Sequence, residues 1–305
     1  LPGRLETTQP SPAHNRDANM KPFRWTITKR EQLGTLIDKP GSINLIRRDF
    51  LSDIREASAR IVALGEDSDL AFIGRTPENF FDYLSGVFSN VDEGPALHLV
   101  HFSLRWSGPK GVRSIESNTL NGFFDYLVDE GVDATSISQS AKPLALVDFV
   151  ASGGTMNNFV ELLRSQAERY GIDWNSVQRR LRILGLRART HNSPNTWRWE
   201  QHQDWLHLIP DATIKNVSAP AHLLYHLAND QPKVTHSFHP GRWGGDGTDD
   251  HHVIDEQKQA LGLAVQLFDA GRDRKERLQF ASLIANSQEM RQAATRRLVS
   301  RLKGK

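Results

Sequence analysis

Short apolar runs alternate with segments of helical periodicity along most of the chain. Residues 69–73, 96–102 and 144–147 are apolar runs of strand length. Between them, apolar residues recur at spacings of three and four, as on the buried side of a helix. These helical segments cover residues 43–64, 77–84, 119–130 and 156–170. The alternation predicts an α/β fold with a mainly parallel sheet flanked by helices.

The pattern changes after residue 170. Residues 177–189 combine leucines and an isoleucine with five arginines, and we interpret them as a basic helix. Residues 253–302 are predicted to be mostly helical, with a break near Gly271. We therefore expect three parts, which are a linker or expression remnant (1–19), an α/β domain (20–252) with a variable region at about 171–252, and a helical C-terminal extension (253–305). A native segment that docks on the domain is the alternative for residues 1–19.

The most informative stretch follows the third apolar run. Asp148 ends that run, and a turn of Ser152, Gly153, Gly154 and Thr155 opens the next helical segment. Such a loop places backbone N–H groups and hydroxyls at a helix N-terminus, where phosphate is stabilised. Open α/β sheets bind ligands at the carboxyl ends of their strands. The sequence predicts a phosphate site beside a carboxylate; an ordinary turn with glycines for close packing is the alternative.

This stretch, from Val147 to Thr155, resembles the phosphoribosyl-diphosphate-binding motif of the type I phosphoribosyltransferases. In that family, an apolar strand leads into two acidic residues, a few small or apolar residues, and a Thr/Ser-Gly-Gly-Thr-like loop. Phe149 departs from the motif because it stands where the second acidic residue usually is. The resemblance implies a Rossmann-like glycosyltransferase that binds phosphoribosyl diphosphate with Mg²⁺. It would transfer phosphoribose to or from an unidentified base-like acceptor, and the variable region would be its hood.

The resemblance also implies roles for individual residues. Asp148 would face the ribose hydroxyls and act as the metal ligand, and Arg75 would contact the diphosphate. The residues expected to bind the ligand are Asp148, Val150, Ala151, Ser152, Gly153, Gly154, Thr155, Gly74, Arg75 and Thr76. Phe149 keeps a second hypothesis open, a catalytically degenerate regulatory protein that binds a sugar phosphate or a nucleotide. A third hypothesis is a partner-interaction scaffold that acts through its C-terminal helices.

Two further loops support an anion site at the same sheet edge. Gly74, Arg75 and Thr76 lie between an apolar run and a helical segment, where Thr76 is a suitable N-cap and Pro77 suits the first helical position. A surface arginine beside a helix start is the alternative. The basic loop at 105–113 resembles the family's flexible lid in position, and a solvated connection is its alternative.

Residues 236–252, which are rich in His and Asp, are a candidate metal site, although their spacing matches no known motif. Alternatively, residues 239–243 (His-Pro-Gly-Arg-Trp) border the ligand cleft, where Trp243 beside Arg242 could stack on a planar base. Ordinary surface packing is the competing interpretation.

Composition narrows the classes of function. The chain has 305 residues, a net charge of +2 and no cysteine, which excludes disulfides, thiolate metal sites and cysteine nucleophiles. Its apolar runs are too short for a membrane span, and no signal peptide is evident, so we expect a cytoplasmic protein. The basic run at 177–189 and the arginine-rich C-terminus suggest nucleic-acid binding. Charge runs on helices are mostly solvated faces, however, and no recognition motif appears, so we do not expect a nucleic-acid partner. Whether the protein forms a homo-oligomer stays an open question at this point.

Overall fold

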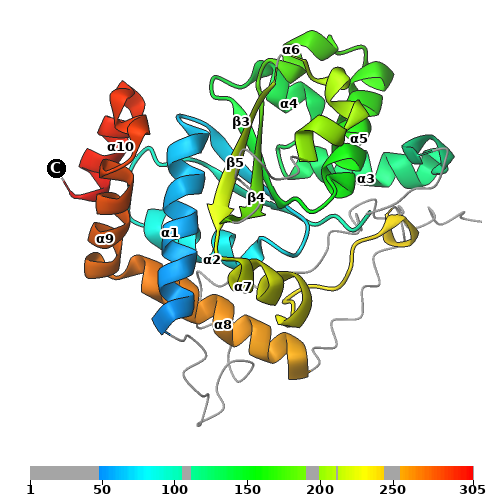
Figure 1. The fold of residues 1–305 in the computed structure, drawn as a ribbon. Coiled ribbons are helices and arrows are strands. Elements are labelled where there is room, and N and C mark those ends of the chain that lie inside the picture. The colour runs from blue at the N-terminus through cyan, green and yellow to red at the C-terminus, as the bar shows by residue number, and fades with distance from the viewer. Residues whose placement is uncertain (1–47, 105–110, 190–198, 211, 244–254, 305) are drawn as a thin grey trace, which may run out of the picture.

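The centre of the protein is one sheet of five parallel strands in the order β2-β1-β3-β4-β5 (Figure 1). The computed structural model describes residues 48–104, 111–189, 199–210, 212–243 and 255–304. The strands are β1 (Asp69–Ile73), β2 (Leu97–Val100), β3 (Leu144–Phe149), β4 (Leu181–Ala188) and β5 (Thr213–Ala219). Every pair of neighbouring strands is parallel, which confirms the predicted α/β class.

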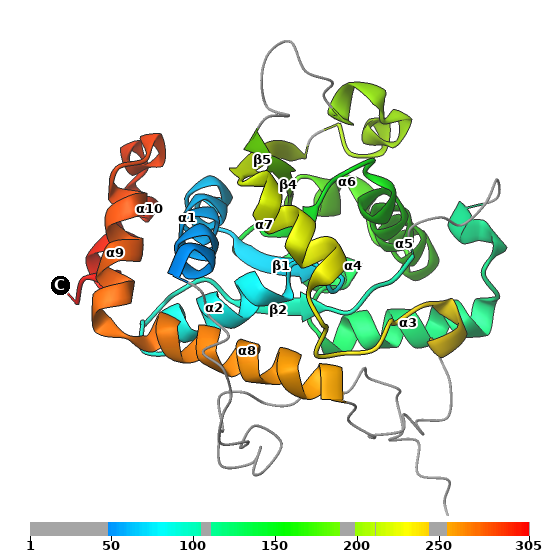
Figure 2. The ribbon, with the colours of Figure 1, turned by 60° about the horizontal axis from the view of Figure 1, so that its bottom comes forward.

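Helices cover both faces of the sheet (Figures 1 and 2). One face carries α1 (Arg48–Gly65), α2 (Glu78–Phe88), α7 (Ala221–Tyr225), α9 (Arg274–Ala285) and α10 (Ala293–Leu302). The other carries α3 (Ser117–Asp129), α4 (Ala134–Gln139), α5 (Gly154–Tyr170) and α6 (Trp174–Gln178). Short 3-10 or π turns complete the chain: η3 (Gly111–Ser114), η5 (Trp199–His202), η6 (Asp204–Leu208), η7 (His226–Asp230), η8 (Pro240–Arg242) and η9 (Gln288–Arg291). Each face has its own apolar core.

The prediction of a basic helix over residues 177–189 is wrong, because most of this segment is strand β4. Ile183 packs in the core on the α5 side, whereas Leu184 and Leu186 pack in the core on the α1 side. A strand covered on both faces is apolar at nearly every position, so its pattern does not separate it from a helix. Arg182, near the start of β4, pairs with Glu66, which directly follows α1.

The C-terminal helices share the core of the sheet. Helix α8 (Asp255–Arg272) crosses α2, and two glycines allow the close approach. A Cβ atom on Gly86 would lie 2.0 Å from the carbonyl oxygen of Phe268, and one on Gly271 would lie 2.3 Å from that of Tyr83. Phe280 of α9 is also fully buried, and its ring contacts those of Tyr83 and Phe88 of α2. Helices α8 to α10 are therefore packed as part of the α/β structure.

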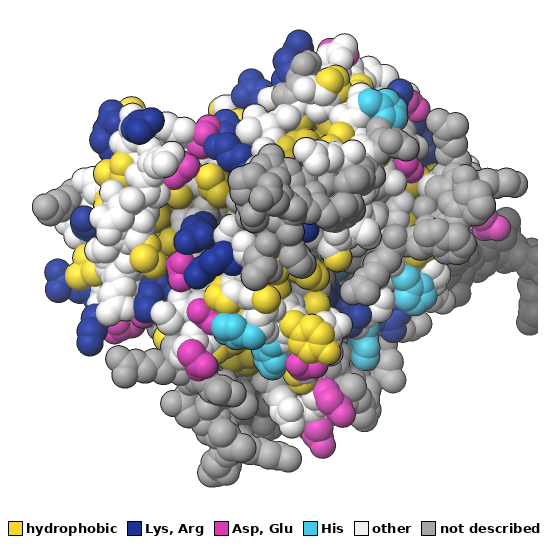
Figure 3. Space-filling view, viewed as in Figure 1, with side chains coloured by type: hydrophobic (Ala, Val, Ile, Leu, Met, Phe, Trp, Pro, Cys, Tyr) yellow, Lys and Arg dark blue, Asp and Glu magenta, His cyan; other side chains and the backbone are white. Residues whose placement is uncertain are grey.

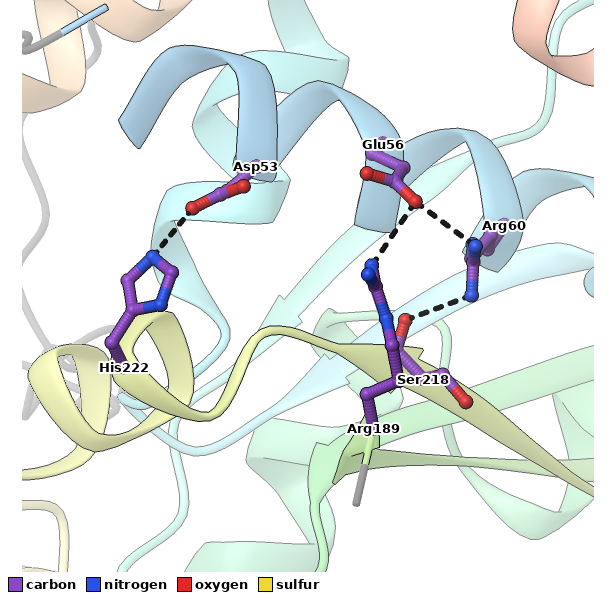
Figure 4. A network of polar contacts seen from close by, with 6 residues as sticks. All are labelled: Asp53, Glu56, Arg60, Arg189, Ser218 and His222. Carbon is purple, nitrogen blue, oxygen red and sulfur yellow. Dashed lines mark hydrogen bonds and ion pairs between the residues drawn. The ribbon is translucent and has the colours of Figure 1, made fainter. Parts of the chain in front are cut away.

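A polar network ties α1 to the carboxyl ends of β4 and β5 and to α7 (Figure 4). It consists of Asp53–His222 (2.8 Å), Glu56–Arg60 (2.9 Å), Glu56–Arg189 (3.2 Å) and Arg60 donating to the Ser218 carbonyl (3.3 Å). Most of these side chains are partly exposed, so each pair contributes roughly 0–1 kcal/mol. The network orients α1, and the apolar core below it supplies most of the stability.

Candidate functional site

The strand order places a cleft between the ends of β1 and β3. The connection after β1 leads outward to β2, whereas β3 lies on the other side of β1, so the direction of winding reverses here. Open α/β sheets bind ligands in the crevice at such a reversal, outside the carboxyl ends of the strands. A cleft of about 850 Å³ lies at this point. Its lining includes every residue predicted to bind the ligand: Gly74, Arg75, Thr76, Asp148, Val150, Ala151, Ser152, Gly153, Gly154 and Thr155.

The β3–α5 loop forms one wall of the cleft. Asp148 is the penultimate residue of β3 and is only 6% exposed, and its Oδ1 accepts a hydrogen bond from the Phe149 N–H at 2.7 Å. Gly153 is the N-cap of α5 and has φ = 80°, a conformation that glycine adopts without strain. Ser152 is exposed, and Thr155 lies in the first turn of the helix. The wall thus combines a carboxylate, a helix N-terminus and two hydroxyls.

Two tryptophan-bearing turns support this loop from behind. A Cβ atom on Gly153 would lie 3.2 Å from Cε3 of Trp199 and 3.1 Å from Oε1 of Gln203. Trp199 is fully buried, and its Nε1 donates to Oδ1 of Asn216 on β5 at 2.9 Å. Trp205 donates to the same Gln203 oxygen at 3.0 Å. This support was not predicted, because residues 199–205 are far from the loop in sequence.

The β1–α2 loop forms the opposite wall. Gly74 has φ = 80°, and a Cβ atom there would lie 3.1 Å from the carbonyl oxygen of Phe102. Arg75 lines the cleft, and its Nη1 donates to the Thr235 carbonyl at 3.4 Å. The expected cap by Thr76 is wrong, because α2 has Pro77 as its N-cap, with no side-chain cap bond. Thr76 nevertheless lines the cleft.

A third wall comes from the segment after β5, of which the sequence suggested only the part that begins at His239. Asn229, Lys233, Ser237 and His239 line the cleft. Burial lowers the pKa of the Lys233 ammonium, and the Arg75 guanidinium acts in the same direction, whereas Glu78 opposes both. Lys233 donates to the Leu227 carbonyl. Two cationic side chains from distant parts of the sequence therefore meet in the cleft.

The segment 233–238, which we call the strap, is fixed at several points. The Val234 N–H donates to Oε1 of the buried Glu78 at 3.3 Å. The Ser103 N–H donates to the Phe238 carbonyl at 2.9 Å, and the Phe238 N–H donates to Ser103 Oγ at 3.2 Å. Oγ1 of Thr235 lies 3.3 Å from Nδ1 of His101. These bonds hold Lys233 beside Arg75.

The apolar side of the strap rests on α8. Val234 is 4% exposed and packs in a cluster with Ala260, Leu261, Ala264, Val265 and Phe268. Nε2 of Gln257, also on α8, donates to the Val234 carbonyl at 3.4 Å. The C-terminal helices therefore support one wall of the cleft.

Trp243 does not face a ligand. It is 3% exposed and stacks on Phe123 with 4.2 Å between the ring centroids. Its Nε1 donates to the Phe238 carbonyl at 3.3 Å. The suggested stacking of a base on Trp243 is therefore wrong, and the nearby His239 and Pro240 are the residues that reach the cleft.

Other sequence-based candidates fall partly outside the described residues. These are most of the lid, residues 105–110, and most of the His/Asp-rich segment, residues 244–252. Among the residues that the structure does describe, no three His, Cys, Asp or Glu side chains form a group suited to a metal ion. Mg²⁺ often takes only one or two carboxylates and completes its shell with water and substrate phosphates. Among the described residues that line the cleft, Asp148 is the one carboxylate, and it fits that mode of binding.

Comparison of the chain with protein-family models, with curated proteins and with solved structures finds no match. The fold and the cleft together define the class, a doubly wound parallel α/β protein of a kind compatible with nucleotide binding. Within the described residues, every helix is too short or too polar to cross a bilayer.

Proposed function

We propose that the cleft binds phosphoribosyl diphosphate with Mg²⁺ and transfers phosphoribose to or from a base-like acceptor. The observation that carries this proposal is that the two loops suggested by the motif line one cleft at the reversal of strand order. The β3–α5 loop would hold the 5′-phosphate at the N-terminus of a 17-residue helix. Arg75 and Lys233, on the opposite side, would hold the diphosphate.

The proposed reaction depends mainly on positioning the two reactants and on stabilising the charge of the departing diphosphate. As a nitrogen nucleophile displaces diphosphate from the anomeric carbon, the C–O bond breaks and the C–N bond forms. In the transition state, positive charge develops on the sugar and negative charge on the departing diphosphate. Arg75 and Lys233 would stabilise the departing diphosphate. Asp148 would hold the ribose hydroxyls, and the backbone of the loop would fix the 5′-phosphate so that the two reactants meet in line. Mg²⁺ would neutralise part of the diphosphate charge when bound, with Asp148 as its protein ligand.

Calorimetric titration with phosphoribosyl diphosphate and MgCl₂ tests the binding step. We expect heat with the intact protein and a loss of affinity of about 10- to 100-fold in Lys233→Met, since a hydrogen bond to a charged group contributes about 1.5–3 kcal/mol. Asp148→Asn is expected to weaken binding and to reduce its dependence on Mg²⁺. Lys275→Met, a change at an exposed lysine of α9, is the matched control and should bind as the wild type does. No heat with the wild-type protein would overturn the proposal.

A second candidate function is binding without turnover, and Phe149 favours it. Its side chain packs against the core on the α1 side, so the strand end offers Asp148 as its one carboxylate. Diphosphate release across a panel of purine and pyrimidine bases separates the two functions. Release with any base supports the transferase, whereas tight binding with no release for any base supports a regulatory protein.

A further inference from the structure

The C-terminal helices carry an unbalanced charge. Residues 274–303 contain eight Lys or Arg and two Glu, a net charge of +6 in a chain whose total is +2. One of the two acids, Glu276, is turned inward, where it pairs with Arg55 at 2.7 Å and accepts a bond from Tyr83 at 3.0 Å. Figure 3 shows dark-blue side chains gathered at the left, over α9 and α10. The surface of these helices is therefore predominantly cationic.

The charges of α10 lie mainly away from its buried residues. Thr295, Val299 and Leu302 are its buried residues. At 100° per residue, Arg297 and Arg301 fall on the opposite half, and Arg296 falls at its border. Lys303 directly follows the helix and lies closer to the buried side. We call this set of cations the α10 basic face. It consists of Arg296, Arg297, Arg301 and Lys303.

Part of this basic face is already paired within the protein. Arg301 pairs with Glu93, and Arg296 donates to the carbonyls of Met290 and Arg291. Arg297 is exposed, and neither it nor Lys303 has a side-chain hydrogen bond or ion pair within the described part of the chain. Arg297 and Lys303 are therefore available to bind an external anion.

We propose that the α10 basic face binds the phosphate backbone of a nucleic acid. A membrane surface fits less well, because the apolar side of α10 is buried in the core and cannot insert. A protein partner also fits less well, because stable protein interfaces need an apolar centre. Of the exposed large hydrophobic side chains in the described residues, only Leu283 belongs to α9 or α10. Binding to the phosphate backbone of a nucleic acid depends mainly on cationic side chains and does not require an apolar centre.

Nucleic-acid binding at this face differs from the sequence-based expectation, which treated the C-terminal charge run as a solvated helix face. It is also independent of the cleft, because the basic face is built from α10 and none of its residues lines the cleft. Binding would be insensitive to base sequence, because phosphate contacts carry no sequence information.

Fluorescence anisotropy with a labelled 20-base-pair DNA duplex and a 20-nucleotide RNA strand tests the proposal. Two phosphate contacts to the duplex, from Arg297 and Lys303, give a slope of about −1.8 for log K against log salt concentration, so that affinity falls about 10-fold between 50 and 200 mM KCl. In Arg297→Gln/Lys303→Gln, the slope should shrink by about two. Tighter binding of either probe identifies the preferred nucleic acid.

Arg164→Gln/Arg179→Gln, which removes two cations from the α5 side, is the matched control and should keep the wild-type slope. Thermal unfolding checks that both variants are folded. The proposal is overturned if neither probe binds at 50 mM KCl, or if the control pair lowers the slope equally. It is also overturned if polyglutamate competes as well as duplex at equal charge, since that result would indicate an acidic protein partner.

Discussion

The two ends of α5 offer a direct test of how the phosphate loop is held. Gly153 and Gly171 cap the same helix, and both have a left-handed backbone, with φ = 80° and 66°. An alanine in that conformation costs about 1–2 kcal/mol. A Cβ atom on Gly171 would meet nothing within 4 Å, whereas one on Gly153 would lie 3.2 Å from the buried Trp199 ring and 3.1 Å from Gln203.

Gly171→Ala should therefore lower the free energy of unfolding by only about 1–2 kcal/mol. Gly153→Ala should lower the free energy of unfolding by about 1–3 kcal/mol more than Gly171→Ala does, the usual range for overpacking a rigid site. Urea unfolding at constant m-value measures both changes. Trp199→Phe, which removes the contacting ring atoms, should recover much of the extra loss in the double variant. Equal losses at Gly153 and Gly171 would refute the conclusion that Trp199 holds the loop rigidly.

Three more predictions concern stability. Gly86→Ala should destabilise the protein by about 3 kcal/mol or more, because its Cβ would lie 2.0 Å from a carbonyl oxygen of α8; thermal unfolding measures this. Burial alone would raise the pKa of Glu66, but hydrogen bonds from Lys215 and Arg182 outweigh it and lower the pKa from 4.5 to about 2. The stability that ionised Glu66 contributes is complete above pH 4.5 and is lost as the pH falls toward 2. The free energy of unfolding should therefore fall less steeply with acid in Glu66→Gln than in the wild type. Deletion of residues 255–305 should abolish cooperative unfolding in calorimetry, and a truncated protein that unfolds cooperatively would contradict the shared core.

The sequence predicted the parts of the site that are local. Asp148 and the glycine turn follow one another directly, and Gly74 to Thr76 directly follow an apolar run, so strand ends and loops could be inferred from composition. The β4 strand was missed because its two buried faces remove the alternation that marks a half-exposed strand. Lys233 was missed for another reason, since it belongs to no motif and reaches the cleft only through the tertiary placement of the strap.

The strap explains why the C-terminal helices matter for the cleft although they contribute none of its described lining. Helix α8 packs on α2, and the first residue of α2, Glu78, binds the strap at Val234. Helix α8 binds the other side of Val234 through its apolar cluster and Gln257. Lys233 is therefore held between two helices that approach each other through glycines. We therefore expect a change in the α2–α8 contact to shift Lys233 relative to Arg75, and the β3–α5 loop, supported by Trp199, to stay in place.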